Sequence, residues 1–140
     1  MALPVEIVSP RDKTPAKVTT WGELVTGDLA PSTSSFKNLD VANTGYNFIA
    51  PVDGKDIFIT GFHMYANKNV ANTDAVVILY ANGVSGTDLT TTEILFETEM
   101  PKFSSLTITG IKLKVTEQGM WVNAKTDDDD IFVTLFYYYA

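Results

Sequence analysis

The stretch Asp56-Ile-Phe-Ile-Thr-Gly-Phe-His-Met-Tyr-Ala66 decides the fold. Its β-branched and aromatic residues favour a strand, and both of its faces are largely apolar. Strict alternation places Ile59 and His63 on one face and Phe58 and Phe62 on the other. A two-layer sandwich covers only one face of each sheet, so the surplus apolar face predicts a subunit interface.

The same character recurs from residue 41 onward, in short segments separated by Gly, Asn, Asp and Pro. The predicted strands cover residues 43–50, 56–66, 75–82, 93–99, 106–116, 120–125 and 131–139. This spacing is typical of a sandwich or barrel, and no window has sustained helical periodicity. In 106–116 the apolar phase slips by one residue at Thr109-Gly110, which predicts a bulge or a bend between sheets.

Residues 1–40 have a different composition. They hold four of the six prolines and the polar run Ser32-Thr-Ser-Ser35, which disfavour a long ladder or helix. We predict an extended N-terminal arm over residues 1–40, partly paired to the sandwich, and one sandwich domain over residues 41–140. Within the arm, Thr20-Trp-Gly-Glu23 fits a helix-capping box about as well as a strand, so both conformations stay open.

Length and charge exclude several classes of protein. A chain of 140 residues without cysteine forms one domain with no disulfide and no thiolate metal site. Its formal charge of −7, with no cluster of basic residues, repels phosphate backbones and anionic membranes. The start, Met1-Ala-Leu-Pro-Val-Glu6, lacks the basic and apolar regions of a signal peptide, and no apolar run approaches the ~20 residues of a membrane span. We expect neither a nucleic-acid partner nor a membrane partner.

Signals of catalysis are sparse. His63 is the only histidine, and its place inside a strand favours a core or interface imidazole over a general base. Gly83-Val-Ser85-Gly86 lacks the second half of a nucleophile elbow. Acidic residues are numerous, but the sequence pairs none of them across a groove as a glycosidase needs. We expect no enzymatic activity, no cofactor and no small-molecule ligand.

The acidic run Asp127-Asp128-Asp129-Asp130 is the most conspicuous charged feature. Adjacent carboxylates repel one another, and a calcium ion with oxygen ligands at a turn relieves such repulsion. The spacing is not that of an EF-hand loop, because its central glycine and final glutamate are missing. We expect a solvated or partner-facing turn, with a divalent-cation site on these four residues as the alternative.

Three segments together resemble a known class of proteins. They are Tyr46-Asn-Phe-Ile-Ala-Pro51 with its continuation through Phe62, Asn72-Thr-Asp-Ala-Val-Val-Ile-Leu-Tyr80, and Asn123-Ala-Lys-Thr-Asp-Asp with the closing aromatic strand. Over roughly residues 40–140 the chain resembles the small jelly-roll virion proteins of tailed bacteriophages. The resemblance implies a non-catalytic homotrimer on the virion, with a terminal arm that joins the domain to the shell. A Pro-rich arm without a repeat or coiled-coil shaft favours decoration of a surface over a fibre tip.

We therefore expect an all-β, single jelly-roll β-sandwich with an extended N-terminal arm, acting as a capsid decoration (cement) protein. It would bind the major capsid protein on the outer capsid surface, as a homotrimer whose weak contacts add up. The residues expected in arm docking are Val5, Ile7, Val8, Trp21 and Leu24. The residues expected in trimer packing are Phe58, Phe62, Tyr137 and Tyr139.

Two rival functions remain at this stage. The first is a tail-associated receptor-binding or glycan-binding module that uses Trp121 or the Asn-rich loop after Ala66. The second is a small esterase or glycosidase, which the single histidine disfavours.

Overall fold

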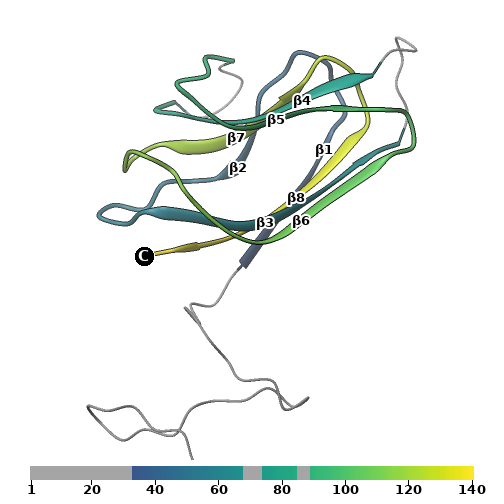
Figure 1. Ribbon diagram of the computed structural model, residues 1–140. Helices are drawn as coiled ribbons and strands as arrows, with labels where there is room; N and C mark the ends of the chain where they lie inside the picture. The colour runs from purple at the N-terminus through teal and green to yellow at the C-terminus, as the bar shows by residue number, and fades with distance from the viewer. Residues whose placement is uncertain (1–32, 68–73, 85–88) are drawn as a thin grey trace, which may run out of the picture. The chain divides into compact units, whose positions relative to one another are not determined.

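The computed structural model describes residues 33–67, 74–84 and 89–140, which form eight strands and no helix (Figure 1). The strands are β1 (Thr33–Leu39), β2 (Tyr46–Ile49), β3 (Ile57–Ala66), β4 (Ala75–Asn82), β5 (Glu93–Met100), β6 (Ser105–Lys114), β7 (Trp121–Thr126) and β8 (Ile131–Tyr139). The all-β prediction is confirmed for this part of the chain. The same residues include no helix long and apolar enough to cross a membrane.

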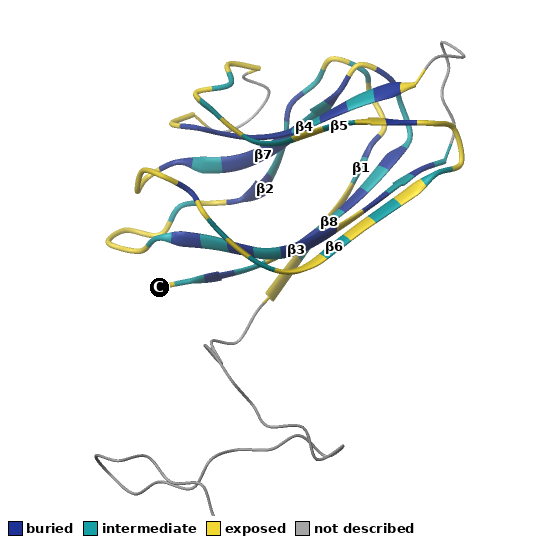
Figure 2. Cartoon of the chain, in the orientation of Figure 1, coloured by how far each residue is buried: buried dark blue, intermediate teal, exposed yellow. Residues whose placement is uncertain are grey.

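The strands form two antiparallel sheets with the orders β1-β8-β3-β6 and β2-β7-β4-β5. We call them the first and the second sheet. Their inner faces pack on each other around one apolar core, as in a β-sandwich. Figure 2 shows buried residues alternating mostly with partly buried ones along the central strands. Ile59 and Leu135 of the first sheet and Val77 and Leu79 of the second are each 0% exposed.

A bulge in the middle of β3 sets which side chains reach the core. The register of β3 against β8 shifts between Ile59 and Gly61, so β3 carries one residue more than β8 there. The side-chain alternation therefore changes phase at Thr60. A methyl group on Gly61 would lie 2.7 Å from the carbonyl oxygen of Ile108, so only glycine fits this close approach of β3 and β6.

The predicted slip in the sixth strand is confirmed. Gly110 has a φ of +70°, and the register of β6 against β3 shifts at this point. A positive φ suits glycine, which lets the strand accommodate extra residues without leaving the sheet. Because β6 pairs with β3 on both sides of the shift, Gly110 is a bulge rather than a bend between sheets.

The first strand was not among the predicted ones. Residues 33–39 pair with β8 over their whole length, and Leu39 is 0% exposed in the core. Residues 33–39 thus form part of the first sheet, which agrees with the prediction that the stretch 1–40 is partly paired to the sandwich. Polar residues such as Ser34 and Ser35 are tolerated because β1 is an edge strand with only one neighbour.

The other predicted strands correspond to β2 through β8 with small shifts of their ends. The largest shift is at β2, which begins at Tyr46 rather than at residue 43. Asn43 instead adopts a φ of 55°, and its N–H donates to the carbonyl oxygen of Thr126. Asparagine tolerates this left-handed conformation well, so the turn extends further than strand propensity indicated.

Candidate functional site

Aromatic rings cover the outer face of the first sheet. We call this surface the aromatic face, and it consists of Phe36, Phe58, Tyr65, Phe132, Phe136 and Tyr138. Phe36 is 61% exposed and Phe136 is 38% exposed. Phe58, Tyr65 and Phe132 are half-buried, and Tyr138 is 6% exposed. Exposed rings that gather on one face mark an interaction surface more often than a solvated one.

Five of the six rings of the aromatic face contact one another, in two groups. Phe36 from β1 stacks on Phe132 from β8 with 6.1 Å between ring centroids, and Tyr65 from β3 lies 6.4 Å from Phe132. Phe58 stacks on Tyr138 at 5.1 Å. These distances are within the usual range of aromatic pairs, so neighbouring strands hold the rings in place before any partner binds.

Polar groups accompany the rings on the same face. The Nζ of Lys112 lies 5.1 Å from the centroid of Phe58, a cation–π contact. His63 is exposed in the middle of the sheet, with its Nδ1 2.6 Å from the hydroxyl oxygen of Thr107. The prediction that placed His63 beside Ile59 is wrong, because the bulge at Thr60 turns His63 to the outer face.

The residues predicted at a trimer interface do not lie on one surface. Phe58 belongs to the aromatic face, whereas Phe62 is 1% exposed and packs in the core with its ring 4.7 Å from Phe96. The bulge at Thr60 moved Phe62 to the inner face, so its ring offers almost no surface to a neighbouring subunit.

Tyr137 and Tyr139 lie on the inner side of β8 near its end. Their rings make an edge contact at 5.6 Å, and the Tyr139 hydroxyl donates to the carbonyl oxygen of Ala50 at 2.7 Å. Burial, together with the neighbouring Tyr137, raises the pKa of Tyr139. Both rings therefore close one end of the core and are half-buried in the single chain.

The residues predicted for arm docking lie outside the described residues. They are Val5, Ile7, Val8, Trp21 and Leu24. Their proposed role rests on the sequence alone.

The sandwich has one side where the core is incompletely covered. We call it the open side, and it lies at β5 and β6, the edge strands of the two sheets. β6 has no buried residue and β5 has only Met100. A groove of about 290 Å³ opens here, lined mainly by the apolar side chains of Phe62, Leu95, Phe96, Ile108, Ile111 and Leu113.

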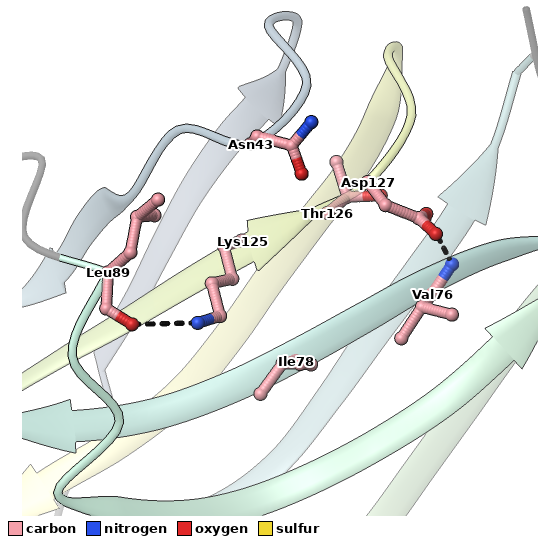
Figure 3. A pocket seen from close by; sticks show the side chains of 7 residues that line it. All are labelled: Asn43, Val76, Ile78, Leu89, Lys125, Thr126 and Asp127. Atoms are coloured by element: carbon pink, nitrogen blue, oxygen red, sulfur yellow. Dashed lines mark hydrogen bonds between the residues drawn. The ribbon is translucent and has the colours of Figure 1, made fainter.

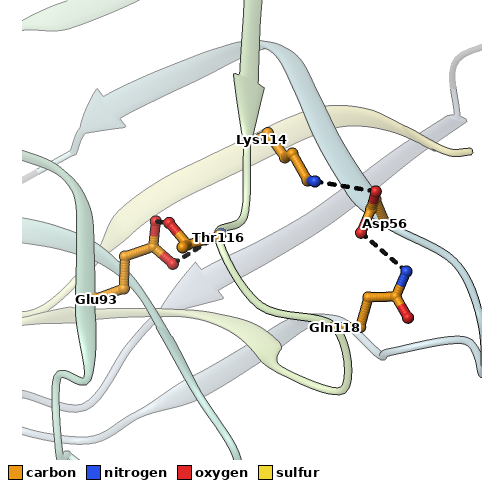
Figure 4. Close-up of polar contacts among 5 residues, drawn as sticks. All are labelled: Asp56, Glu93, Lys114, Thr116 and Gln118. Carbon is orange, nitrogen blue, oxygen red and sulfur yellow. Dashed lines mark hydrogen bonds and ion pairs between the residues drawn. The ribbon is translucent and has the colours of Figure 1, made fainter.

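Polar contacts fix the ends of the edge strands at the open side (Figure 4). The Nζ of Lys114, at the end of β6, lies 3.1 Å from a carboxylate oxygen of Asp56. Hydrogen bonding to Lys114, and next to Gln118, lowers the pKa of Asp56. The carboxylate of Glu93 accepts hydrogen bonds from the backbone N–H and the hydroxyl of Thr116.

A second hollow, of about 250 Å³, lies on the outer face of the second sheet (Figure 3). Its apolar part is formed by Val76, Ile78 and Leu89. Lys125 donates to the carbonyl oxygen of Leu89 at 2.7 Å, and a carboxylate oxygen of Asp127 accepts from the N–H of Val76 at 2.7 Å. The hollow thus combines an apolar wall with charged side chains that already have protein partners.

The acidic run between β7 and β8 forms a turn whose side chains point to different partners. Asp127 binds the backbone of Val76, while Asp130 accepts from the side-chain amide of Asn38. Asp128 is 4% exposed and its carboxylate accepts from the N–H of Asp129. Within the described residues, no group of three or more acidic or histidine side chains converges as a metal site requires.

Trp121 and the Asn-rich loop were the residues predicted for a rival binding role. Trp121 begins β7 opposite Asn82 and is half-buried. Most of the Asn-rich loop, residues 68–73, lies outside the described residues.

The sequence reasoning missed two parts of the surface. Phe36 was counted with the arm. In a strand, Phe36 and Leu39 lie on opposite faces, as they do in β1. The groove residues of β5 and β6 were assigned to ordinary strands, because one sequence does not show which strands lie at an edge.

Comparison with known proteins adds no relative to this description. No known family model matches the chain, and no curated protein is similar enough to count as a relative. Function is therefore inferred from the sequence and from the surfaces described above.

Proposed function

We propose that this chain is a structural virion protein, a capsid decoration protein that binds the outer capsid surface as a homotrimer and stabilises the shell. The observation that carries the proposal is the aromatic face, with Phe36 61% exposed. A protein that works by covering another protein needs a broad, preformed apolar surface rather than a deep cavity.

The geometry of the aromatic face supports binding to a large protein surface. Its rings come from β1, β3 and β8, which are hydrogen-bonded neighbours, so the backbone of one sheet holds the rings in fixed positions. Rings held in stacked contact lose little side-chain entropy when a partner covers them. Threonine and histidine side chains between the rings supply hydrogen-bonding groups for the polar part of such an interface.

The strand order supports the finer fold assignment in this proposal. Eight strands in the orders β1-β8-β3-β6 and β2-β7-β4-β5, with most connections crossing between the sheets, fit a jelly roll. Fold does not fix function, so the virion role rests on the sequence resemblance together with the aromatic face.

Binding to empty shells tests the proposal. The purified chain is incubated with empty shells assembled from a major capsid protein, and the bound fraction is measured by sedimentation. We expect saturable binding that the variant Phe36→Ser/Phe136→Ser loses. The matched control is Phe103→Ser/Val52→Ser, which removes side chains of similar exposure, 65% and 43%, away from the aromatic face. Equal binding by both variants would mean that the aromatic face is not the docking surface.

A truncation tests the contribution of the arm. Deleting residues 1–20 is expected to abolish shell binding while the unfolding midpoint and the mass in solution stay unchanged. Unfolding of the truncated chain, or full shell binding by it, would remove the arm from the proposal.

The second candidate function is glycan binding as part of a tail-associated module. The observation that favours it is the hollow beside Lys125 and Asp127, where an apolar wall adjoins hydrogen-bonding groups. Sugar rings present both a C–H face and hydroxyl groups, so such a mixed site suits one or two residues of a glycan. Binding on a glycan array that Lys125→Ala abolishes, without any binding to shells, would favour this function over decoration.

A further inference from the structure

Within the described residues, the open side of the sandwich leaves two strand edges and part of the core uncovered. Among the described strands, β5 pairs only with β4, and β6 pairs only with β3. Their outer edges therefore carry backbone N–H and C=O groups that no strand of the described sheets pairs. The apolar groove between the two edges exposes side chains such as Leu95 and Ile108, which the core alone only half covers.

The two edges carry opposite charges in matching positions. On β5, Glu97 and Glu99 are exposed and lie opposite Ile78 and Val76 of β4, on the outer face of the second sheet. Because they are two residues apart, both point to the same face.

The basic pair lies on the outer face of the first sheet, at β6. Lys114 pairs in register with Phe58, and the Nζ of Lys112 lies over the ring of Phe58. Both lysines are exposed, and Lys114 keeps 48% of its side chain exposed while it contacts Asp56. They have the same two-residue spacing as the glutamates.

We propose that copies of this chain associate through their open sides, with β5 of one copy placed against β6 of the next. The outer faces of the two sheets then adjoin, and Glu97 and Glu99 of one copy become cross-strand neighbours of Lys112 and Lys114 of the other. The neighbouring copy also covers the apolar groove. The occupant of the open side is thus a second copy of the chain, selected by charge complementarity.

This contact joins two unlike edges of the same open side, so the number of copies follows from the homotrimer of the proposed function rather than from the edges themselves. A contact between different surfaces of identical chains closes into a ring when the rotation permits it. Each copy has one acidic and one basic edge, so a ring leaves no open side uncovered. The inference rests on the self-association in the proposed function and assigns that association to β5 and β6, in place of the four residues predicted from the sequence.

The charges on β5 and β6 could also have the opposite role of keeping copies of the chain apart. Charged side chains and bulges on edge strands also prevent edge-to-edge association, and β6 has both, with Lys112 beside the bulge at Gly110. The two roles predict different masses for the wild type, because charges that prevent association leave the wild type and each single reversal monomeric. If the charges attract a second copy, reversal on one edge breaks the assembly and reversal on both edges restores it.

Charge reversal on the full-length chain tests the inference by light scattering and sedimentation at micromolar concentration. We expect three times the 15.3 kDa mass of one chain for the wild type. Glu97→Lys/Glu99→Lys is expected to be monomeric, and so is Lys112→Glu/Lys114→Glu. The variant with all four changes is expected to recover the trimer. Asp53→Lys/Glu117→Lys, a matched change of two exposed acidic residues in turns, is expected to remain trimeric.

Folding of each variant is checked by thermal unfolding, since Lys114→Glu also removes the contact with Asp56. If a reversal unfolds the chain, Glu97→Gln/Glu99→Gln replaces it, because this pair removes the attraction without adding repulsion. Its dissociation constant is expected to rise roughly fivefold. Added salt should weaken the wild-type assembly and leave the glutamine variant less affected.

The outcomes separate the inference from the proposed function. A monomeric wild type, or a β5 reversal that leaves the mass unchanged, overturns the inference. Retention of shell binding in either case would leave the proposed attachment to the capsid standing. A trimer that the charge swap breaks and restores, but that binds no shell, supports the open-side contact and removes the virion role.

Discussion

Both faces of the first sheet carry large aromatic rings, but the rings of the two faces are buried to very different extents. On the inner face Phe62 is 1% exposed, while on the outer face Phe36 is 61% exposed. The second sheet covers the inner face and no strand of the described chain covers the outer one. The apolar content of a strand therefore does not show which of its faces is buried. Burial depends on which face another sheet covers.

The largest effect is expected where the inner face is truncated. Phe62→Ala removes a fully buried ring that packs on Phe96, and it should lower the free energy of unfolding by about 3–5 kcal/mol. Urea unfolding followed by tryptophan fluorescence measures the change. A loss well below 1 kcal/mol would show that the ring is exposed and that the two faces have been assigned the wrong way round.

The membership of β1 in the sheet is tested at its only fully buried side chain. Leu39→Ala should cost about 2–5 kcal/mol, because Leu39 is 0% exposed and pairs with Ile131 of β8. Lys37→Ala, an exposed position on the same strand, is the control and should change the stability little. Equal and small effects would instead place residues 33–39 with the arm.

The bulge that separates the two faces is tested at Gly61. Gly61→Ala places a methyl group 2.7 Å from the carbonyl oxygen of Ile108, so β3 and β6 must move apart, and we expect a loss of about 1–3 kcal/mol. At Gly83, where the added group meets nothing within 4 Å, the same substitution should be nearly neutral. A Gly61→Ala variant as stable as the wild type would contradict the close approach of β3 and β6 at the bulge, where the side-chain alternation of β3 changes phase.

A smaller, pH-dependent effect is expected at the surface contact of Asp56. The folded state lowers the pKa of this carboxyl, so its contribution to stability is complete above the ordinary aspartate pKa of about 4 and is lost as the pH falls through the lower folded value. The difference in unfolding midpoint between wild type and Asp56→Asn should therefore shrink as the pH falls from 6 toward 2. A difference that grows in acid would mean that the pKa is raised.

The smallest effect on stability is expected on the outer face. Phe36→Ala removes an exposed ring whose main contact is the stack on Phe132, so the free energy of unfolding should fall by less than about 1 kcal/mol. Chemical unfolding in parallel with Phe62→Ala gives the direct comparison of the two faces. A loss as large as that of Phe62→Ala would show that the outer face is structural rather than available to a partner.

Local sequence determined the class of fold and most strand positions. β-branched and aromatic segments between turn-forming residues predict strands wherever they occur, and β3 through β8 follow them closely. The slip at Gly110 was also predictable from the sequence, because a change of phase in a period-two pattern shows in the order of neighbouring residues. Composition likewise excludes disulfides within the chain, because it contains no cysteine.

Tertiary structure decided which of the apolar residues face the core and which remain on the surface. Phe62 and His63 exchanged the faces that alternation predicts, because the bulge at Thr60 arises from pairing with β8, more than sixty residues away in the chain. Residues 33–39 form a strand because they pair with β8, although their polar sequence has little strand propensity of its own. The open side exists only because β5 and β6 end their sheets, and strand order is a property of the whole chain that no local pattern encodes.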